Sequence, residues 1–382
     1  MSPAVTVLRS VQGTRPRLTG PQLVVDLDAI AANTQTFARR TPGELMAVVK
    51  ADGFGHGAAD VARTALAHGA SQLGVTAIAE GLALRAAGLS APVLSWLNPV
   101  DADWAAAIGA DLDVAVPSRD HLDALAHAAA QIGGRARVHL HLDAGMARDG
   151  ASPSEWAALC RAARRAELLG QVQVVGMMGH LGCADDPAHP SNSTGRTRFA
   201  WGLMTARAAG LRPAQRHLAA TSATLLDPLS HHTMSRVGAG LVGIDPTGTT
   251  ELRGALTVTA PLVEVRSVLA GTPVGYGHSW TAPAATRLGL VPLGYADGLP
   301  RLASGEAWMR VRGVHAPVAG RISMDMTVVD LGSSGADVGD EVTVIGPRGS
   351  GGPTVADWAG WSGLLPHEIV TGLGGRLVRR TA

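Results

Sequence analysis

The sequence predicts an α/β fold, a TIM-like (β/α)8 barrel, followed by a C-terminal domain rich in β-strands. Short apolar segments alternate with alanine-rich segments that carry apolar residues at three- and four-residue spacing, as strands followed by amphipathic helices do. Eight such alternations over roughly 220 residues are typical of a (β/α)8 barrel. After Pro246 the helical period gives way to alternating strands separated by glycine and proline turns.

The expected barrel occupies residues 23–248. This range begins with an opening strand at 23–27, which can pack on the C-terminal domain. The eight barrel strands are expected at 45–50, 72–76, 92–97, 111–116, 137–143, 172–181, 216–221 and 235–244. Helices are expected between them, at 58–68, 78–87, 120–131, 154–169 and 197–209.

The expected C-terminal β domain occupies residues 249–382. Its strand signals include the alternating segments at 263–268, 307–312 and 341–345. The linker at 245–254, rich in threonine and glycine, marks the boundary between the two domains. Residues 1–22 remain as an N-terminal extension.

Composition limits the classes of function. Hydrophobic residues make up 46% and charged residues 16% of the 382 positions, and the formal net charge is +1, so charge gives no reason to expect a nucleic acid or membrane partner. No apolar run is long enough to span a membrane, and the start lacks a signal-peptide pattern, so we expect a cytoplasmic protein. Two cysteines, Cys160 and Cys183, make neither a disulfide framework nor a metal site, and no metal cluster is evident among the 14 histidines.

Lys50 is the most informative residue. It is the one lysine among 32 lysine and arginine residues, and it follows an apolar strand and precedes a glycine-rich turn. An amine can lose its proton and form a Schiff base with a carbonyl compound, which a guanidinium cannot do. A codon bias toward arginine explains the arginines, but a chance surviving lysine would more often lie on a solvated helix. The position therefore favours a catalytic amine at the carboxyl end of a barrel strand.

The residues around Lys50 carry a family resemblance. The segment Val-Val-Lys-Ala-Asp-Gly-Phe-Gly-His-Gly at 48–57 resembles the cofactor-lysine signature of the alanine racemases, which bind pyridoxal 5'-phosphate on a fold-type III barrel. The two tyrosines of the chain, Tyr276 and Tyr295, also lie in segments similar to motifs of that family. The resemblance runs from about residue 23 to residue 380, nearly the whole chain.

The resemblance implies a two-base mechanism. Lys50 holds the cofactor and exchanges a proton on one face of the substrate α-carbon, and Tyr276 serves the other face. His180 is expected to hydrogen-bond toward that tyrosine, and Arg236 to face the pyridine nitrogen. An arginine keeps its proton, so the ring nitrogen stays unprotonated, which favours racemisation over transamination. The family supplies the tyrosine from a partner subunit, so the resemblance implies a homodimer.

The same resemblance assigns the binding residues. The phosphate group is expected at Thr221, for which Ser222 is the rival, and at the backbone of Gly238 and Ala239. The substrate carboxylate is expected at Arg148 and at the backbone N–H of Met324, with Arg148 also near the phenolic oxygen of the cofactor. Residues that resemble the substrate entrance of the family are Tyr295 and Arg301.

Several positions depart from the family pattern. Phe54 and Gly375 stand where many members have tyrosines, His141 stands where many have a lysine that orients the arginine corresponding to Arg148, and Ala144 replaces a hydroxyl residue. A neutral imidazole at 141 could accept a hydrogen bond from Arg148 but brings no negative charge. Three functions therefore stay open: an alanine racemase supplying D-alanine for peptidoglycan precursors, a racemase of another small or polar amino acid such as serine, and a non-catalytic pyridoxal phosphate carrier.

Overall fold

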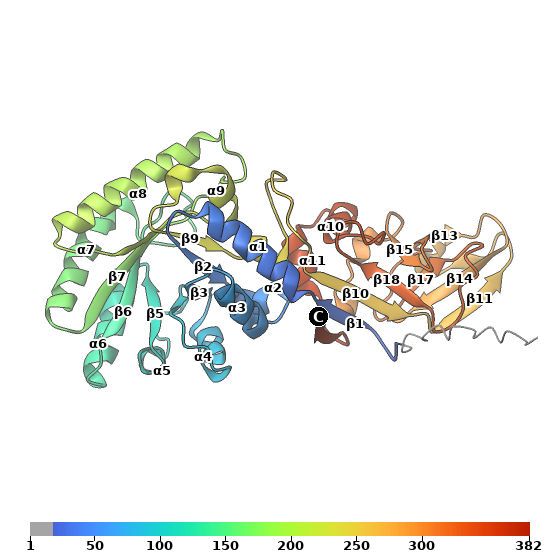
Figure 1. Ribbon diagram of the computed structural model, residues 1–382, viewed down its shortest axis with the longest axis horizontal. Helices are drawn as coiled ribbons and strands as arrows, with labels where there is room; N and C mark the ends of the chain where they lie inside the picture. The colour runs from blue at the N-terminus through green and yellow to red at the C-terminus, as the bar shows by residue number, and fades with distance from the viewer. Residues whose placement is uncertain (1–17) are drawn as a thin grey trace, which may run out of the picture.

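The computed structural model describes residues 18–382, so most of the predicted extension at 1–22 lies outside the described residues. The chain forms two lobes side by side, a barrel of strands and helices and a lobe built mostly of strands (Figure 1). None of the helices in residues 18–382 is long and apolar enough to cross a membrane.

The first lobe is a barrel of eight parallel strands in the order β8-β7-β6-β5-β4-β3-β2-β9. The ring closes where the Arg236 N–H donates to the carbonyl of Ala219 (3.0 Å) and the Thr233 N–H to that of Arg216 (3.1 Å). The predicted (β/α)8 barrel is thus confirmed. Its strands are β2 (Glu44–Val48), β3 (Gln72–Val75), β4 (Val93–Ser95), β5 (Leu112–Val116), β6 (Ala136–His141), β7 (Val172–Met178), β8 (Gln215–His217) and β9 (Met234–Val237).

Helices surround this barrel, and several boundaries differ from the expectation; the strand expected at 216–221, for example, ends at His217, and Thr221 begins a helix. The helix expected from 197 begins at Pro190, because proline suits a first helical turn and His189 caps it by accepting from the Ser191 N–H. The strand expected at 235–244 stops at Val237 and continues as a 3-10 turn, η2 (Ala239–Val242). The helices are α1 (Leu27–Arg40), α2 (Lys50–Phe54), α3 (Ala58–Ala67), α4 (Ile78–Ala86), α5 (Trp104–Gly109), α6 (Arg119–Gln131), α7 (Pro153–Leu168), α8 (Pro190–Ala208) and α9 (Thr221–Leu226), followed by the 3-10 turn η1 (Pro228–Ser230).

The second lobe is rich in strands, as expected. A six-stranded sheet has the order β16-β15-β18-β10-β1-β19, and beside it lie a three-stranded sheet, β11-β14-β17, and the hairpin β12-β13. The strands are β1 (Gln22–Val25), β10 (Leu256–Pro261), β11 (Glu264–Val268), β12 (Pro273–Val274), β13 (Trp280–Thr281), β14 (Thr286–Val291), β15 (Trp308–Val311), β16 (Val314–Pro317), β17 (Thr327–Asp330), β18 (Glu341–Ile345) and β19 (Val378–Thr381).

The opening strand β1 belongs to the second lobe, where it pairs antiparallel with β10 and parallel with β19. Both ends of the described chain therefore lie in one sheet. This lobe also contains two helices that the alternating pattern did not suggest, α10 (Val355–Ser362) and α11 (Pro366–Gly372), and the 3-10 turns η3 (Tyr276–His278), η4 (Tyr295–Asp297) and η5 (Arg301–Ala303).

The interior of the barrel is partly polar. An apolar cluster of Met46, Leu94, Ala115, Met178 and Met234 fills one level. The strands also bury Asp113, His139 and His217, each at most 1% exposed, where apolar branched side chains are usual. Buried polar groups are costly unless they are hydrogen-bonded, so this part of the core must contain a satisfied network.

Candidate active site

Lys50 lies just beyond the carboxyl end of β2, at the start of an unusual turn. Ala51 (φ 51°), Asp52 (φ 53°) and Phe54 (φ 56°) adopt the left-handed conformation together with Gly53. For residues with a Cβ this conformation costs roughly 1–2 kcal/mol each. The fold must therefore hold this turn in place.

Contacts from three other elements hold the turn. The Ala51 N–H donates to Oε1 of Glu80 (2.8 Å), on α4. The Asp52 carboxylate accepts from the Ala58 N–H of α3 (2.9 Å) and pairs with Arg379 of β19 (2.6 Å). The position of Lys50 thus depends on both lobes.

Lys50 opens into a cavity of about 530 Å³ at the carboxyl ends of the barrel strands. The cavity brings together eight residues that the sequence predicted as site residues, namely Lys50, Arg148, His180, Thr221, Ser222, Arg236, Gly238 and Ala239. Phe54 and His141, two of the departures from the family pattern, also line it.

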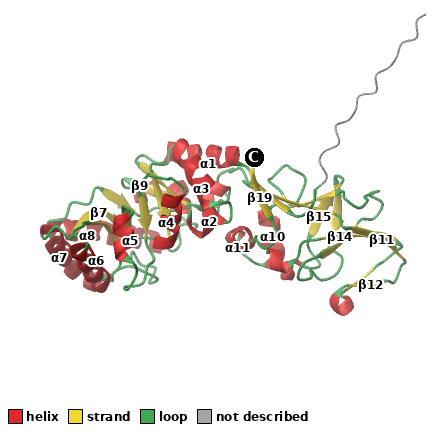
Figure 2. Ribbon diagram, turned by 90° about the horizontal axis from the view of Figure 1, so that it is seen from below, coloured by secondary structure: helices red, strands yellow, loops and turns green. Residues whose placement is uncertain are grey.

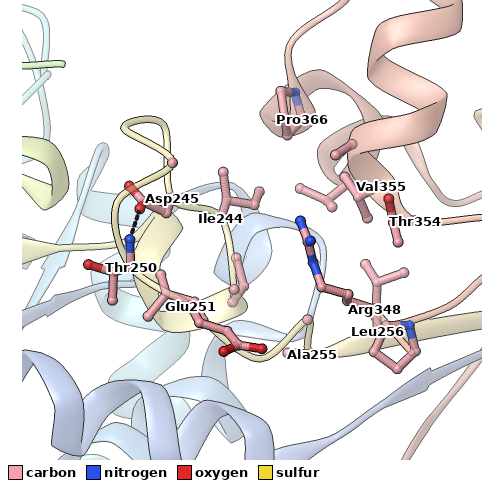
Figure 3. A pocket seen from close by; sticks show the side chains of 18 of the residues that line it. Ile244, Asp245, Thr250, Glu251, Ala255, Leu256, Arg348, Thr354, Val355 and Pro366 are labelled. Atoms are coloured by element: carbon pink, nitrogen blue, oxygen red, sulfur yellow. Dashed lines mark hydrogen bonds between the residues drawn. The ribbon is translucent and has the colours of Figure 1, made fainter. Parts of the chain in front are cut away.

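A second cavity, of about 500 Å³, lies between the linker and the second lobe. Figure 3 shows Arg348 projecting between Ile244 and Val355 there, and the Thr250 N–H donating to the Asp245 carboxylate (2.8 Å). None of the predicted site residues lines this cavity. We therefore take the Lys50 cavity as the candidate active site.

The Lys50 amine is prepared for reaction by its surroundings. Burial lowers the pKa of the amine, and the nearby Arg148 guanidinium lowers it further. A lower pKa increases the fraction of neutral amine, which is the form that attacks a carbonyl and accepts a proton.

Arg236 is 5% exposed and almost fully engaged by the protein. Its Nη1 donates to Nδ1 (2.9 Å) and to the carbonyl (2.8 Å) of His217, and its Nη2 donates to the carbonyl of Gly179 (2.7 Å) and to Nδ1 of His180 (3.2 Å). No acceptor within residues 18–382 is recorded for Nε, so the Nε–H is the guanidinium donor left for a group in the cavity. Burial lowers the pKa of Arg236 to about 10, so it stays protonated at neutral pH.

The bond from Arg236 fixes the tautomer of His180. Since Nδ1 of His180 accepts, its proton sits on Nε2. Burial, and then the charge of Arg236, lower the pKa of His180 to about 3, so the ring is neutral. His180 is therefore a hydrogen-bond donor through Nε2, able to stabilise an oxyanion.

A cradle of backbone groups follows β9. In the described chain, no acceptor is recorded for the N–H groups of Gly238 and Ala239, and both residues line the cavity with Thr221 and Ser222. The Phe54 ring packs on Gly238, where a Cβ would lie 2.7 Å from two ring atoms. Free N–H groups beside hydroxyls suit an anion such as a phosphate.

Arg148 is exposed at the cavity wall, and His141 does not contact it by hydrogen bond. Instead Nδ1 of His141 lies 3.4 Å from Oδ2 of Asp149. Burial raises the pKa of Asp149, but the His141 contact and the Gly150 N–H outweigh burial and lower it. Asp149, which the sequence did not suggest, thus places a negative charge beside His141.

The remaining predicted residues lie in the second lobe. Tyr276 is 68% exposed and Met324 58% exposed. Figure 2 shows β12, which precedes Tyr276, at the outer end of this lobe, away from the barrel. Tyr295 lies in η4 with the Arg301 guanidinium 5.8 Å from its ring centre. None of the four lines the Lys50 cavity of its own chain.

The structure adds His367 to the cavity, and Gly375 does not line the cavity of its own chain. His367 comes from α11, lines the cavity and packs near the Phe54 ring, with 6.1 Å between ring centres. Gly375 instead lies against the backbone of Ala296 and Asp297. The residue that shapes this wall is therefore an imidazole, and helix α11, which the strand pattern hid, is what brings it there.

The fold and the site define a (β/α)8 barrel protein with a half-buried lysine amine, a buried arginine and free backbone N–H groups in one cavity. Comparison with known proteins specifies the class. Residues 25–246 match the alanine racemase N-terminal domain and residues 255–381 the alanine racemase C-terminal domain. The chain belongs to the alanine racemase family, as the sequence motifs indicated.

Individual relatives agree over nearly the full length. The chain is 42% identical to the alanine racemase of Frankia casuarinae over 364 residues, 94% of this chain and 95% of that protein. The alanine racemase of a D-cycloserine producing Streptomyces lavendulae is 40% identical, with a TM-score of 0.93 over 96% of this chain and 98% of that one. The alanine racemase of Bartonella henselae, solved with covalently bound pyridoxal phosphate, has a TM-score of 0.86 at 26% identity over 96% of this chain and all of that one.

Proposed function

We propose that the protein interconverts L-alanine and D-alanine with pyridoxal 5'-phosphate, by proton transfer on both faces of the α-carbon. The observation that carries this proposal is the single lysine of the chain in a cavity that also contains Arg236, His180 and the backbone cradle. The D-alanine formed would supply peptidoglycan precursors in the cytoplasm, a location that cell fractionation tests.

The residues of the cavity fit this cofactor. Lys50 supplies the amine for its aldehyde, the Nε–H of Arg236 the donor for its ring nitrogen, and Gly238, Ala239 and Thr221 or Ser222 the donors for its phosphate. Bound pyridoxal phosphate supplies an electron sink for the charge that develops at the substrate α-carbon. Because Arg236 keeps its own proton, the ring nitrogen stays unprotonated and the sink is weak, which favours return of a proton to carbon.

Lys50 moves the proton on one face. Its lowered pKa allows Nζ to accept the α-proton from one enantiomer and to return a proton when the other enantiomer reacts. No other lysine is present in the chain that could replace it.

Tyr276 of a partner subunit serves the opposite face in this proposal. A phenol with a pKa of about 10 is a weak base at neutral pH and needs a donor that stabilises its anion. The Nε2–H of His180, held toward the cavity by the bond that Arg236 makes to Nδ1, is such a donor. Exposure of Tyr276 and Met324 in the single chain supports a homodimer in which both enter the partner's cavity.

The substrate carboxylate would then bind between Arg148 and the backbone N–H of Met324. Met324 uses its carbonyl to accept from the Ala296 N–H (2.8 Å), and no acceptor in the described residues is recorded for its own N–H. Tyr295 and Arg301, which are in cation–π contact, would line the entrance.

A racemase of polar amino acids is the second candidate. His367 on the cavity wall favours it, because an imidazole can hydrogen-bond a hydroxyl side chain and an apolar wall cannot. The carrier reading has less support, since the chain carries the β-rich second lobe with Tyr276.

One experiment tests these statements together. The purified protein is incubated in heavy water with L-alanine, L-serine and other L-amino acids, and α-deuterium and chirality are followed for wild type, Lys50→Ala and Tyr276→Phe. Deuterated D-alanine as the fastest product supports the proposal. Faster turnover of serine than of alanine would support a racemase of polar amino acids. Cofactor binding without exchange in the wild type would support a non-catalytic carrier.

Subunit mixing tests the shared site. Each homodimer of Lys50→Ala or Tyr276→Phe should be nearly inactive, whereas random mixing should restore about a quarter of wild-type activity, because half of the dimers contain one intact site. A mixture that exchanges subunits but stays inactive contradicts the contribution of Tyr276 across the interface.

A further inference from the structure

A chain of hydrogen-bonded, buried polar side chains crosses the barrel interior. It runs from Arg236 toward the amino-terminal ends of the barrel strands. Nη1 of Arg236 lies 2.9 Å from Nδ1 of His217, and Nε2 of His217 lies 2.8 Å from Nδ1 of His139. Nε2 of His139 lies 3.2 Å from Oδ2 of Asp113, whose other oxygen accepts from Nε of Arg137 (2.6 Å). The proposed roles of Lys50, Tyr276 and His180 involve none of the last four residues.

The direction of every bond in this chain is determined. A guanidinium only donates, so Nδ1 of His217 accepts and its proton sits on Nε2. That proton is donated to Nδ1 of His139, whose own proton must then sit on Nε2 and be donated to Asp113. Donation runs in one direction, from Arg236, which can only donate, to the Asp113 carboxylate, which can only accept.

The barrel makes room for this chain. The His139 ring occupies the space above Gly176 of β7, where a Cβ would lie 2.1 Å from Nδ1 of His139. The pairing of β6 with β7 shifts register between Val138 and His139, at the same place. His139 and His217 are both 0% exposed. These features indicate a built arrangement and exclude a chance encounter of surface groups.

Asp113 also supplies the negative charge that this core requires. Asp113 and Asp297 are the buried carboxylates of residues 18–382, and Asp297 lies in the second lobe, where it pairs with Arg376. Burial raises the pKa of Asp113, but the bonds from His139 and Arg137 outweigh burial and lower it, so the group is ionised at neutral pH. Burial lowers the pKa of His217 well below its ordinary value, so that ring stays neutral.

We infer that Asp113 is a remote positioning residue for Arg236, acting through His139 and His217. By fixing both imidazoles with the proton on Nε2, it presents an acceptor to Nη1 of Arg236 and holds the Nε–H toward the cavity. This inference rests on the proposed function for the role of that Nε–H toward the ring nitrogen, but the hydrogen-bond directions themselves do not depend on it.

Removal of the Asp113 carboxylate would leave the hydrogen-bond chain without its terminal acceptor. In Asp113→Leu no acceptor remains for Nε2–H of His139, so His139 can carry its proton on Nδ1, facing the Nε2–H of His217. His217 must then change tautomer as well, and its Nδ1–H would face the donors of Arg236. Arg236 would move, and the ring nitrogen would gain access to a proton.

The test uses the pyridoxal phosphate-loaded protein and nitrogen NMR of the histidine side chains, assigned with His139→Gln and His217→Gln. In the wild type both residues should carry the proton on Nε2. In Asp113→Leu both should change tautomer, and kcat should fall roughly 10–100-fold, the range found for residues that orient metal ligands indirectly. Pyruvate released per racemisation should rise, because a protonated ring nitrogen favours transamination, which converts alanine to pyruvate. Asp113→Asn keeps an acceptor oxygen and should retain the wild-type tautomers.

The matched control is Asp123→Asn, in an exposed pair with Arg119, which should change none of these readouts. A wild-type protein with the proton on Nδ1 of either histidine overturns the inference, even if Asp113→Leu does not fold. So does a folded Asp113→Leu with unchanged tautomers and unchanged pyruvate ratio. If the wild type has the expected tautomers but racemises no amino acid, the proposed function fails and the hydrogen-bond chain stands.

Discussion

Gly238 and Phe54 provide a quantitative test of the cofactor cradle. A Cβ at position 238 would lie 2.7 Å from Cε2 and Cζ of Phe54 and 3.2 Å from Cβ of Val48. The backbone of Gly238 has φ −127° and ψ −73°, so a Cβ there meets no left-handed strain. The effect of Gly238→Ala therefore comes from its collision with the Phe54 ring.

The expected magnitude follows from two opposing effects. Overpacking of a core contact costs roughly 1–3 kcal/mol. Replacing glycine by alanine at a compatible position restricts the unfolded chain and stabilises by about 0.4–1 kcal/mol. We expect Gly238→Ala to lower the free energy of unfolding by about 1–2 kcal/mol in the wild type. In a Phe54→Leu background, which lacks both colliding atoms, the same change should be neutral or stabilising.

The assay is urea denaturation of the four cofactor-free proteins of this double-mutant cycle, compared through their midpoints at a common slope. Gly109→Ala is the matched control, because no atom would lie within 4 Å of its Cβ. We also expect Gly238→Ala to weaken pyridoxal phosphate binding, since the Gly238 N–H moves with the clash. An equal loss of stability in both backgrounds would refute the reasoning.

Three further predictions concern the lysine turn. Ala51→Gly should raise the free energy of unfolding by about 0.5–1 kcal/mol in urea, because Ala51 is left-handed (φ 51°, ψ 50°). Burial lowers the pKa of His56 from 6.5 to about 4, so as the pH falls through this window the unfolded state binds a proton that the folded state does not. Between these pH values the free energy of unfolding of the wild type should therefore fall by up to about 3 kcal/mol relative to that of His56→Asn. The same pH dependence of stability in both proteins would contradict this assignment. Arg379→Ala should change stability by less than about 1 kcal/mol, because its pair with Asp52 is largely exposed.

The fold was predictable where apolar residues recur along the sequence with the period of a strand or a helix. All eight barrel strands formed near their expected positions, because each is a short apolar run between helical patterns. Helices α10 and α11 were not expected, since they are short and lie among strand signals in the second lobe. The early start of α8 at Pro190 depends on a cap and a proline, which periodicity does not detect.

The site was predictable where composition is unusual. The single lysine identified Lys50, and motif resemblance identified the residues that line the cavity with it. His367 was not predicted as a site residue because helix α11 was not expected. Asp113 and His139 did leave a signal, since each is a polar residue inside an apolar barrel strand, but a single polar residue does not show which partner it faces.

Racemisation requires proton transfer on two faces of the α-carbon, so the site needs two groups that exchange protons. Lys50 is suited to one face. Arg236 keeps its proton at neutral pH, and His180, with a pKa of about 3, is not an acid there. His141 faces Asp149, so His367 is the remaining imidazole of the lining residues, and both tyrosines lie in the second lobe. Of the imidazole and phenol groups, the candidates for the second base are His367 of the same chain and Tyr276 of a partner. Subunit mixing separates the two, because a Lys50→Ala subunit can complete the site of a Tyr276→Phe subunit only if the second base crosses the interface. If His367 is the second base, Tyr276→Phe stays active without mixing and His367→Phe abolishes exchange.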